Sequence, residues 1–183
     1  KQKGLAMEFI IRSAVPGDAA QIREIYAPYV LYTCVSFEFE VPSLEEITRR
    51  IDKSLKRYAF LVCEVQGAIV GYAYATEHRA RAAYRYSADT SVYIREGYQR
   101  QGLGRALYEA LFDALLKRGI YTLVAGVALP NPGSVGLHKA MGFAEVGVYR
   151  NIGYKFGQWH DRMNLQKALR AYDTPEEAPS PTP

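Results

Sequence analysis

The chain has 183 residues, of which 49% are apolar and 23% are charged, and its formal net charge is +4. This balance is typical of one globular domain and excludes collagen, coiled coils and wholesale disorder. No stretch approaches the roughly 18 consecutive apolar residues of a membrane span, and no secretion signal is visible. We therefore expect a cytoplasmic protein with no membrane contact. Cys34 and Cys63 lack metal-binding spacing, which favours two reduced thiols and no metal.

The excess positive charge lies in residues 1–170, because residues 171–183 contain three acids and no base. A basic domain suits an anionic partner. Nucleic acid and a small polyanion, such as a phosphorylated cofactor, both fit the charge. The chain has no long run of basic residues and no recognised nucleic-acid module, so we expect no nucleic-acid partner.

The expected domain covers residues 7–170. Residues 1–6 precede Met7 and are interpreted as an added leader, outside the fold. Residues 171–183 hold four of the nine prolines and are predicted to form a disordered tail. We find no internal repeat.

The first half of the domain mixes helical and strand patterns. Residues 9–12 predict a short strand, and Pro16-Gly17-Asp18 begins a helix that runs to about residue 30. Ser43-Leu44-Glu45-Glu46 is a capping box, in which a hydroxyl and a carboxylate satisfy free N–H groups of a helix that ends near residue 55. Residues 58–65 and 68–76, separated by Gln66-Gly67, predict a hairpin.

The second half continues the alternation. Residues 88–94 predict a third long strand, and residues 102–118 carry the clearest amphipathic stripe of the chain. A buried strand follows at 122–127, and a short helix at 134–141 ends at Gly142. The last two strands are predicted at 144–149 and 159–165. This order implies an α/β fold with a mixed sheet and helices on its faces.

The loop that joins the third long strand to the amphipathic helix has the composition of an anion-binding loop. Gly102 and Gly104 permit close approach of a ligand to the backbone, and Arg100 and Arg105 add positive charge. The first N–H groups of the following helix are free to bind phosphate. A dinucleotide motif would need glycine at Leu107, and a P-loop would need Gly-Lys-Ser/Thr. Two interpretations remain, pyrophosphate capture by Gln-x-x-Gly-x-Gly or a glycine-capped loop without a ligand.

The Gln-x-x-Gly-x-Gly loop resembles the acetyl-coenzyme A motif of the GNAT acetyltransferases. Six further segments resemble the phosphinothricin N-acetyltransferase branch of that superfamily, and the resemblance spans about residues 9–169. These segments are 33–38, 81–84, 89–94, 131–134, 137–139 with 142–143, and 147–161. The resemblance implies the GNAT fold, a mixed and mostly antiparallel sheet that is splayed at the cofactor site and has helices on both faces.

The same resemblance implies an activity. The expected reaction moves acetyl from acetyl-CoA to the amine of a small amino-acid-like substrate, such as phosphinothricin, methionine sulfoximine or methionine sulfone. Relatives are commonly dimers, so a homodimer is expected. Two alternatives stay open: an acetyltransferase of proteins or peptides with the same fold, and a non-catalytic coenzyme A sensor.

Acetyl transfer needs a neutral amine, so a base must take the amine proton, directly or through water. Asp89 is the first candidate, at a position where relatives usually carry glutamate, and Glu38 is the weaker one. His138 is the candidate proton donor to the departing thiolate, near the place where many GNAT enzymes have a tyrosine.

The remaining predicted residues bind ligands. Backbone N–H groups can stabilise the thioester oxygen as it gains charge, and the resemblance places them near Tyr93 and Ile94. The expected cofactor-binding residues are Val92, Tyr93, Ile94, Gln99, Arg100, Gln101, Gly102, Leu103, Gly104, Arg105, Ala106, Asn131 and Ser134. The expected substrate-binding residues are Phe37, Arg79, Arg81, Tyr84 and Ala88, because an arginine fork suits a carboxylate or phosphinate.

Overall fold

The computed structural model describes residues 8–173 and residue 175. The predicted leader at 1–6 and the tail from residue 176 onward lie outside the described residues. The first tail residues do have partners, since the Tyr121 hydroxyl donates to Asp173 Oδ1 at 2.6 Å and the Tyr172 hydroxyl lies 3.2 Å from Thr122 Oγ1.

One seven-stranded sheet forms the centre of the protein, with the spatial order β1-β2-β3-β4-β5-β7-β6. Every neighbouring pair is antiparallel except β4 with β5, which is parallel. The mixed, mostly antiparallel sheet is therefore confirmed. The strands are β1 (Ile10–Ser13), β2 (Phe60–Val65), β3 (Ala68–Glu77), β4 (Ser87–Ile94), β5 (Thr122–Ala128), β6 (Ala144–Lys155) and β7 (Gln158–Ala168).

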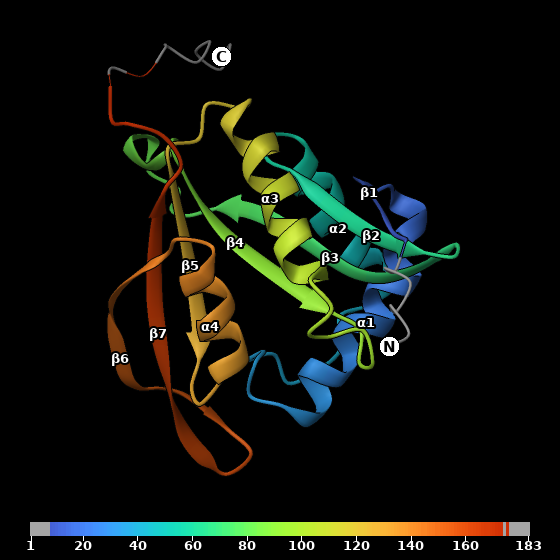
Figure 1. Cartoon of the computed structure of the whole chain (residues 1–183). Helices are drawn as coiled ribbons and strands as arrows, with labels where there is room; N and C mark the ends of the chain where they lie inside the picture. The colour runs from blue at the N-terminus through green and yellow to red at the C-terminus, as the bar shows by residue number, and fades with distance from the viewer. Residues whose placement is uncertain (1–7, 174, 176–183) are drawn as a thin grey trace, which may run out of the picture.

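Helices cover both faces of the sheet (Figure 1). One face carries α3 (Leu103–Leu116) and α4 (Pro132–Ala140), and the other carries α1 (Ala19–Tyr32) and α2 (Leu44–Leu55). Short 3-10 turns, η1 (Pro16–Asp18) and η2 (Ala82–Tyr84), precede α1 and β4. No helix in the described part of the chain is both long and apolar enough to cross a membrane.

Each face has its own apolar core. The α3 stripe of Leu103, Leu107, Leu111 and Leu115 is at most 1% exposed and packs on the sheet with Ala88 and Leu123. On the opposite face, Ile22 and Ile51 pack against Tyr72 and Val62. Burial of each large apolar side chain contributes about 1.5 to 3 kcal/mol to the free energy of unfolding, so these two cores are the main source of stability.

Two details differ from the sequence prediction. The last two strands are longer than predicted, because an irregularity between Tyr149 and Gly153 lets β6 continue through a polar segment to Lys155. In α2, Ser43 accepts the Glu46 N–H at 3.1 Å as predicted. The Glu46 carboxylate, however, pairs with Arg49 and Arg50, both at 2.7 Å, instead of capping the helix.

Candidate active site

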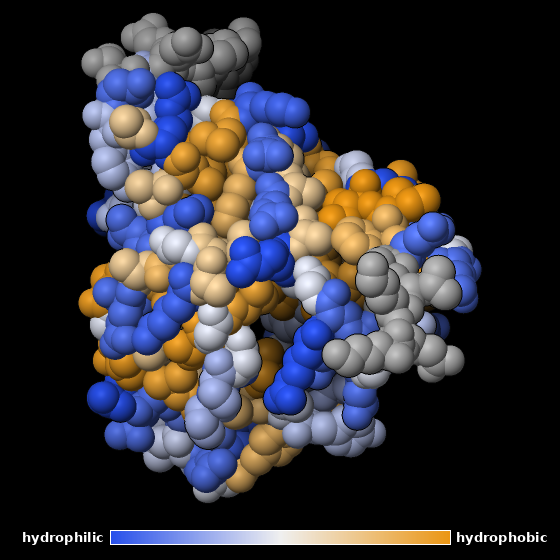
Figure 2. Space-filling model, viewed as in Figure 1, coloured by the Kyte–Doolittle hydropathy of each residue, from blue (hydrophilic) through white to orange (hydrophobic). Residues whose placement is uncertain are grey.

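The two parallel strands at the centre of the sheet separate after three residue pairs. Residues 87–89 of β4 pair with residues 122–124 of β5. Beyond Asp89 and Val124 the two strands are no longer paired. Side chains of both strands, of α3 and of α4 line a cavity in the gap. Figure 2 shows the surface hollowed between the end of β4 and α4. The splay starts at Thr90, earlier than the Tyr93–Ile94 segment where the sequence predicted it.

The N-terminus of α3 offers free backbone donors. Gly102 precedes the helix with φ of +84°, a conformation that glycine adopts readily. Among the described residues, the N–H groups of Leu103, Gly104 and Arg105 have no acceptor, whereas the Ala106 N–H already bonds to the Gly102 carbonyl at 3.0 Å. The free donors and the positive end of the helix dipole make this turn suited to a phosphate.

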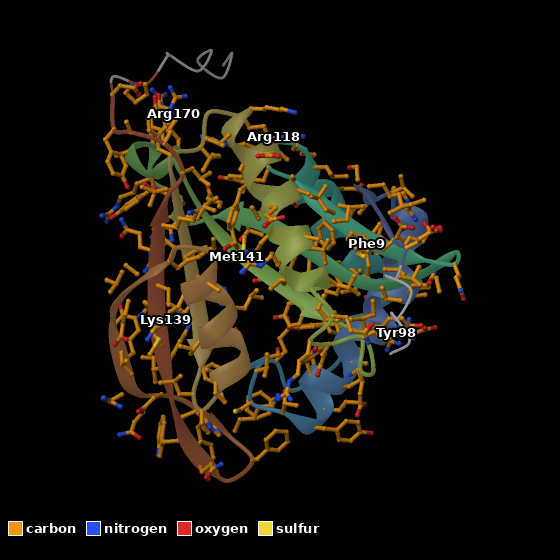
Figure 3. The ribbon with its side chains drawn as sticks, in the orientation of Figure 1. Phe9, Tyr98, Arg118, Lys139, Met141 and Arg170 are labelled. Carbon is orange, nitrogen blue, oxygen red and sulfur yellow. The ribbon has the colours of Figure 1, made fainter. Side chains whose placement is uncertain are left out.

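Two glutamine side chains of the loop before α3 form hydrogen bonds that stabilise this loop. Gln99 Nε2 donates to the Tyr29 hydroxyl at 3.1 Å, and Tyr29 in turn donates to the Ile94 carbonyl at 2.6 Å. Gln101 Nε2 donates to the Gly97 carbonyl at 2.9 Å. Tyr98, labelled in Figure 3, lies in the same loop between β4 and α3. Both glutamine side chains therefore bond within the protein and stabilise the loop.

The opposite wall of the cavity is the start of α4. The Asn131 side chain accepts the Ser134 N–H at 3.1 Å, so Asn131 caps the helix, and both residues also line the cavity.

His138 of α4 is buried and points at a tyrosine. His138 Nδ1 lies 2.7 Å from the Ser134 carbonyl and Nε2 lies 2.8 Å from the Tyr108 hydroxyl. The carbonyl can only accept, so Nδ1 carries the proton and Nε2 accepts from Tyr108. Burial lowers the pKa of His138 and raises that of Tyr108, which keeps both groups neutral.

Asp89 stands at the apex of the splay. Its side chain is 39% exposed, and Oδ1 lies 2.8 Å from Nδ1 of His78, which follows β3. The His78 ring contacts the edge of Tyr84 at a centroid distance of 5.6 Å. Asp89, His78 and Tyr84 thus form one cluster at the point where β4 and β5 part.

Glu38 belongs to a different cluster on the same face of the sheet. Arg50 donates to both of its carboxylate oxygens, at 2.7 and 3.3 Å, and the Tyr26 hydroxyl donates to it at 3.0 Å. Three donors already occupy this carboxylate, so it is less free than Asp89 to take a proton.

A buried lysine fixes the segment between α1 and α2. Lys155, at the end of β6, is 2% exposed, and its ammonium donates to the carbonyls of Val30, Thr33 and Ser36 at 2.7, 3.0 and 2.7 Å. Beside it, the Phe37 ring occupies the space that a β carbon on Gly153 would fill. The β6–β7 hairpin therefore holds the segment that carries Phe37 and Glu38.

Comparison with known proteins places this site in a family. Residues 11–164 match the family model described as the acetyltransferase (GNAT) domain. The phosphinothricin N-acetyltransferase of Streptomyces viridochromogenes is 38% identical over 82% of this chain and 82% of its own length. The chain belongs to the GNAT acetyltransferases. It is an acetyltransferase that uses acetyl-CoA.

Two further relatives support this assignment. The L-methionine sulfoximine/L-methionine sulfone acetyltransferase of Salmonella typhimurium is 33% identical over 91% of this chain and 98% of its own length. A GNAT superfamily phosphinothricin acetyltransferase from Sinorhizobium meliloti, solved with acetyl-CoA, superposes with a TM-score of 0.90 at 32% identity, over 96% of this chain and 97% of that one.

The structure of this acetyltransferase brings most predicted cofactor residues together. Val92, Tyr93, Asn131 and Ser134 line the cavity. The loop from Gln99 to Arg105 leads into the N-terminus of α3, where Gly104 lies close to Leu137 of α4 and Ile94 of β4. Two predicted cofactor residues have backbone groups that are already bonded within the protein. The Ile94 carbonyl accepts from the Tyr29 hydroxyl, and the Ala106 N–H donates to the Gly102 carbonyl.

The predicted substrate residues divide into three places. Phe37 packs on the β6–β7 hairpin, and Tyr84 stands beside His78 near Asp89. Arg79 and Arg81 are exposed in the segment before β4. The methyl group of Ala88 is fully buried in the α3 core, so its side chain does not face a substrate.

Sequence reasoning missed two residues of this acetyltransferase site, His78 and Tyr108. Tyr108 lies on α3 beside Leu107 and Leu111, so the helical pattern alone marks it as a core residue. A hydroxyl in the middle of an apolar stripe was the available signal, because a buried hydroxyl requires a partner.

Replacing Lys155 with methionine tests the link between the hairpin and the α1–α2 segment. We expect a loss of about 2–4 kcal/mol in the free energy of unfolding, because three buried carbonyls lose their donor. The KM of the acceptor should also rise, with that of acetyl-CoA unchanged. Chemical denaturation and steady-state kinetics measure both, and Lys139→Met at an exposed lysine of α4 is the control (Figure 3). Equal effects of the two substitutions would contradict this role.

Proposed function

We propose that this enzyme acetylates the amine of a small amino-acid-like substrate by direct transfer within a ternary complex with acetyl-CoA. One observation carries the proposal: β4 and β5 separate beyond Asp89 and leave a cavity lined by residues 90–93 of β4, and β4 then leads to the loop and the free N–H groups at the start of α3. The names of the relatives favour phosphinothricin, methionine sulfoximine or methionine sulfone as the kind of acceptor.

In this proposal, the N–H groups of Leu103, Gly104 and Arg105 bind the pyrophosphate of the coenzyme, and Arg100 and Arg105 add charge. The arm of the coenzyme then lies in the splay against Val92 and Tyr93, with its thioester near the apex. Backbone groups that β5 leaves unpaired can stabilise the thioester oxygen as it gains charge.

Asp89 is the proposed base for the acceptor amine. It ends the paired part of β4, so an amine that attacks a thioester in the splay lies next to its carboxylate. Because aspartate is short, a water molecule can carry the proton between them. His78 orients the carboxylate at 2.8 Å. Glu38 remains the alternative base.

Tyr108 is the proposed partner of the departing thiolate, with His138 as its positioning residue. Burial raises the pKa of Tyr108 above that of a thiol. When the thiolate forms, the hydroxyl turns its one O–H from His138 Nε2 to the sulfur and stabilises the charge by a hydrogen bond instead of giving up its proton. The sequence analysis expected His138 to contact the departing sulfur, and the proposal gives that contact to Tyr108 instead.

Tyr108→Phe tests this role. Loss of one hydrogen bond to a charged sulfur should lower kcat by roughly 10- to 100-fold, with little change in the KM of acetyl-CoA. Stopped-flow or steady-state detection of free thiol measures the change. An unchanged kcat would remove Tyr108 from the chemistry.

The pH dependence of stability tests the neutral state of His138. Its pKa in the folded protein is below the ordinary 6.5 because of burial, so its contribution is complete above pH 6.5 and is lost as the pH falls through the lowered pKa. We expect the wild type to lose more stability than His138→Gln between pH 7.5 and pH 5, in denaturation curves at matched ionic strength. Parallel losses would contradict the assignment.

The cysteines support direct transfer instead of an acyl-enzyme. Cys63 is fully buried in the core, where burial raises the pKa of its thiol to about 11, so it is a poor nucleophile. Cys34 is free and does not line the cavity. Two free thiols also fit the proposed cytoplasmic location.

A thiol-release assay over a panel of acceptors tests the proposed function. Phosphinothricin, methionine sulfoximine and methionine sulfone should be acetylated far faster than peptides with a free N-terminus. Faster turnover of peptides would favour the protein acetyltransferase alternative. Tight coenzyme binding without turnover of any amine would favour a coenzyme A sensor.

We also propose that the enzyme is a homodimer. The β6–β7 hairpin supports this, because Tyr149, Ile152, Tyr154, Phe156 and Trp159 are each more than half exposed on it. Such an apolar surface is typical of an interface. Light scattering should give twice the 20.6 kDa mass of the chain for the wild type and a lower mass for Trp159→Ser.

A further inference from the structure

Arg162 of β7 has no acidic partner in the part of the chain that the structure describes. In the register of β5 with β7, Arg162 is opposite Ala128 and Asn164 is opposite Gly126. Opposite residues of an antiparallel pair share a face, so Arg162, Asn164 and Gly126 lie on one side of the sheet. Arg162 is half-buried there.

That side is the one that carries Asp89. Leu123, Ala125 and Val127 of β5 are buried in the α3 core, so Gly126, between them, faces the opposite way. On β4, Ala88 is buried in the same core, and Asp89 points away from it beside Val124. Arg162 and the proposed base therefore share one surface.

The Arg162 guanidinium lies directly on Gly126. A β carbon built on Gly126 would fall 1.8 Å from Nη2 and 2.0 Å from Cζ, so the guanidinium occupies the space of the missing side chain. Gly126 itself lines the cavity between β4 and β5. The absence of a side chain at residue 126 thus lets a cation reach the edge of the cavity.

Among the described residues, the Arg162 guanidinium has few hydrogen-bond acceptors for its N–H groups. Its hydrogen bond to Asn164 Oδ1 is its only one among the described residues, and no carboxylate there lies within ion-pair distance. The neighbouring Arg150, in contrast, pairs with Asp161 at 2.6 Å. A guanidinium with several free N–H donors matches a carboxylate in a bidentate arrangement.

We propose that Arg162 binds the α-carboxylate of the acceptor and makes the enzyme selective for free amino acids. This inference rests on the proposed function, since it adds a specificity residue to the same site. An α-amine and its carboxylate are separated by one carbon, so an acceptor whose amine lies next to Asp89 can place its carboxylate over the neighbouring strand, β5, where the Arg162 guanidinium lies. Peptide N-termini and simple amines lack that carboxylate.

Arg162→Met tests the proposal with two acceptors, methionine sulfone and its decarboxylated analogue 3-(methylsulfonyl)propylamine. Methionine sulfone has no other anionic group, so the comparison isolates the carboxylate. We expect kcat/KM for methionine sulfone to fall by about 10- to 100-fold, mainly through KM, and kcat/KM for the amine to change less than about threefold. Arg162→Lys should restore part of the loss, and Arg118→Met, at the far end of α3, should change neither (Figure 3).

Calorimetric binding of methionine sulfone to the enzyme saturated with coenzyme A separates this proposal from the proposed function. Weaker binding in Arg162→Met but not in Arg118→Met supports the role of Arg162, whether or not acetyl transfer is found. If no acetyl transfer is found, that result contradicts only the proposed function. Equal losses for both acceptors, or unchanged binding of methionine sulfone, would overturn the role of Arg162.

Discussion

Asp89→Asn is expected to lower kcat by roughly 10²- to 10⁴-fold, the usual contribution of a general base. The amide keeps the size of the side chain and can still bond to His78, but it cannot take the amine proton. Asp89 is partly exposed at the edge of the splay, so the substitution should leave the fold and the affinity for acetyl-CoA intact. Thiol release at saturating acetyl-CoA and methionine sulfone measures the effect.

Three further variants make this prediction specific. Asp89→Glu should keep substantial activity, since the longer carboxylate reaches the amine with less need for a bridging water. His78→Gln should lower kcat less than Asp89→Asn, because it removes only the group that orients the base. Glu38→Gln should act mainly on the acceptor KM. A large loss of kcat in Glu38→Gln with none in Asp89→Asn would move the base to Glu38.

The sequence predicted the features that depend on neighbouring residues. The amphipathic stripe fixed α3, the glycine motif predicted the free N–H groups at its start, and Ser43 predicted the start of α2. Each of these depends on contacts within about one helical turn, where residue type and spacing suffice. The order of strands and helices followed from the same local patterns.

The features that the sequence did not predict join distant segments. Lys155 binds carbonyls 119 to 125 residues earlier in the chain, and the contact of His78 with Asp89 depends on the register between β3 and β4. Arg162 reaches Gly126 only because β7 inserts between β5 and β6. A single sequence carries no direct signal for such pairings, which is why Asp89 could be named as a candidate base but its contact with His78 could not be predicted.

Gly104→Glu is expected to abolish detectable binding of acetyl-CoA, with a loss of at least about 10²- to 10³-fold in affinity. Gly104 lies in the first turn of α3, where its N–H is one of the three without an acceptor. A glutamate there places a negative charge beside those donors and repels the pyrophosphate. The loss corresponds to two or more charge-assisted hydrogen bonds. Isothermal titration with acetyl-CoA measures the affinity.

The same substitution should not unfold the protein, which separates a lost ligand site from a lost fold. Glutamate in a first helical turn interacts favourably with the dipole, and any residue other than proline favours a helix over glycine. The added β carbon would approach Leu137 Cδ2 at 3.2 Å, a contact that a flexible leucine can relieve. Gly104→Ala carries that β carbon without the charge, so it should bind acetyl-CoA within about tenfold of the wild type. If Gly104→Glu binds the coenzyme as tightly as Gly104→Ala does, the turn at the start of α3 does not hold the pyrophosphate.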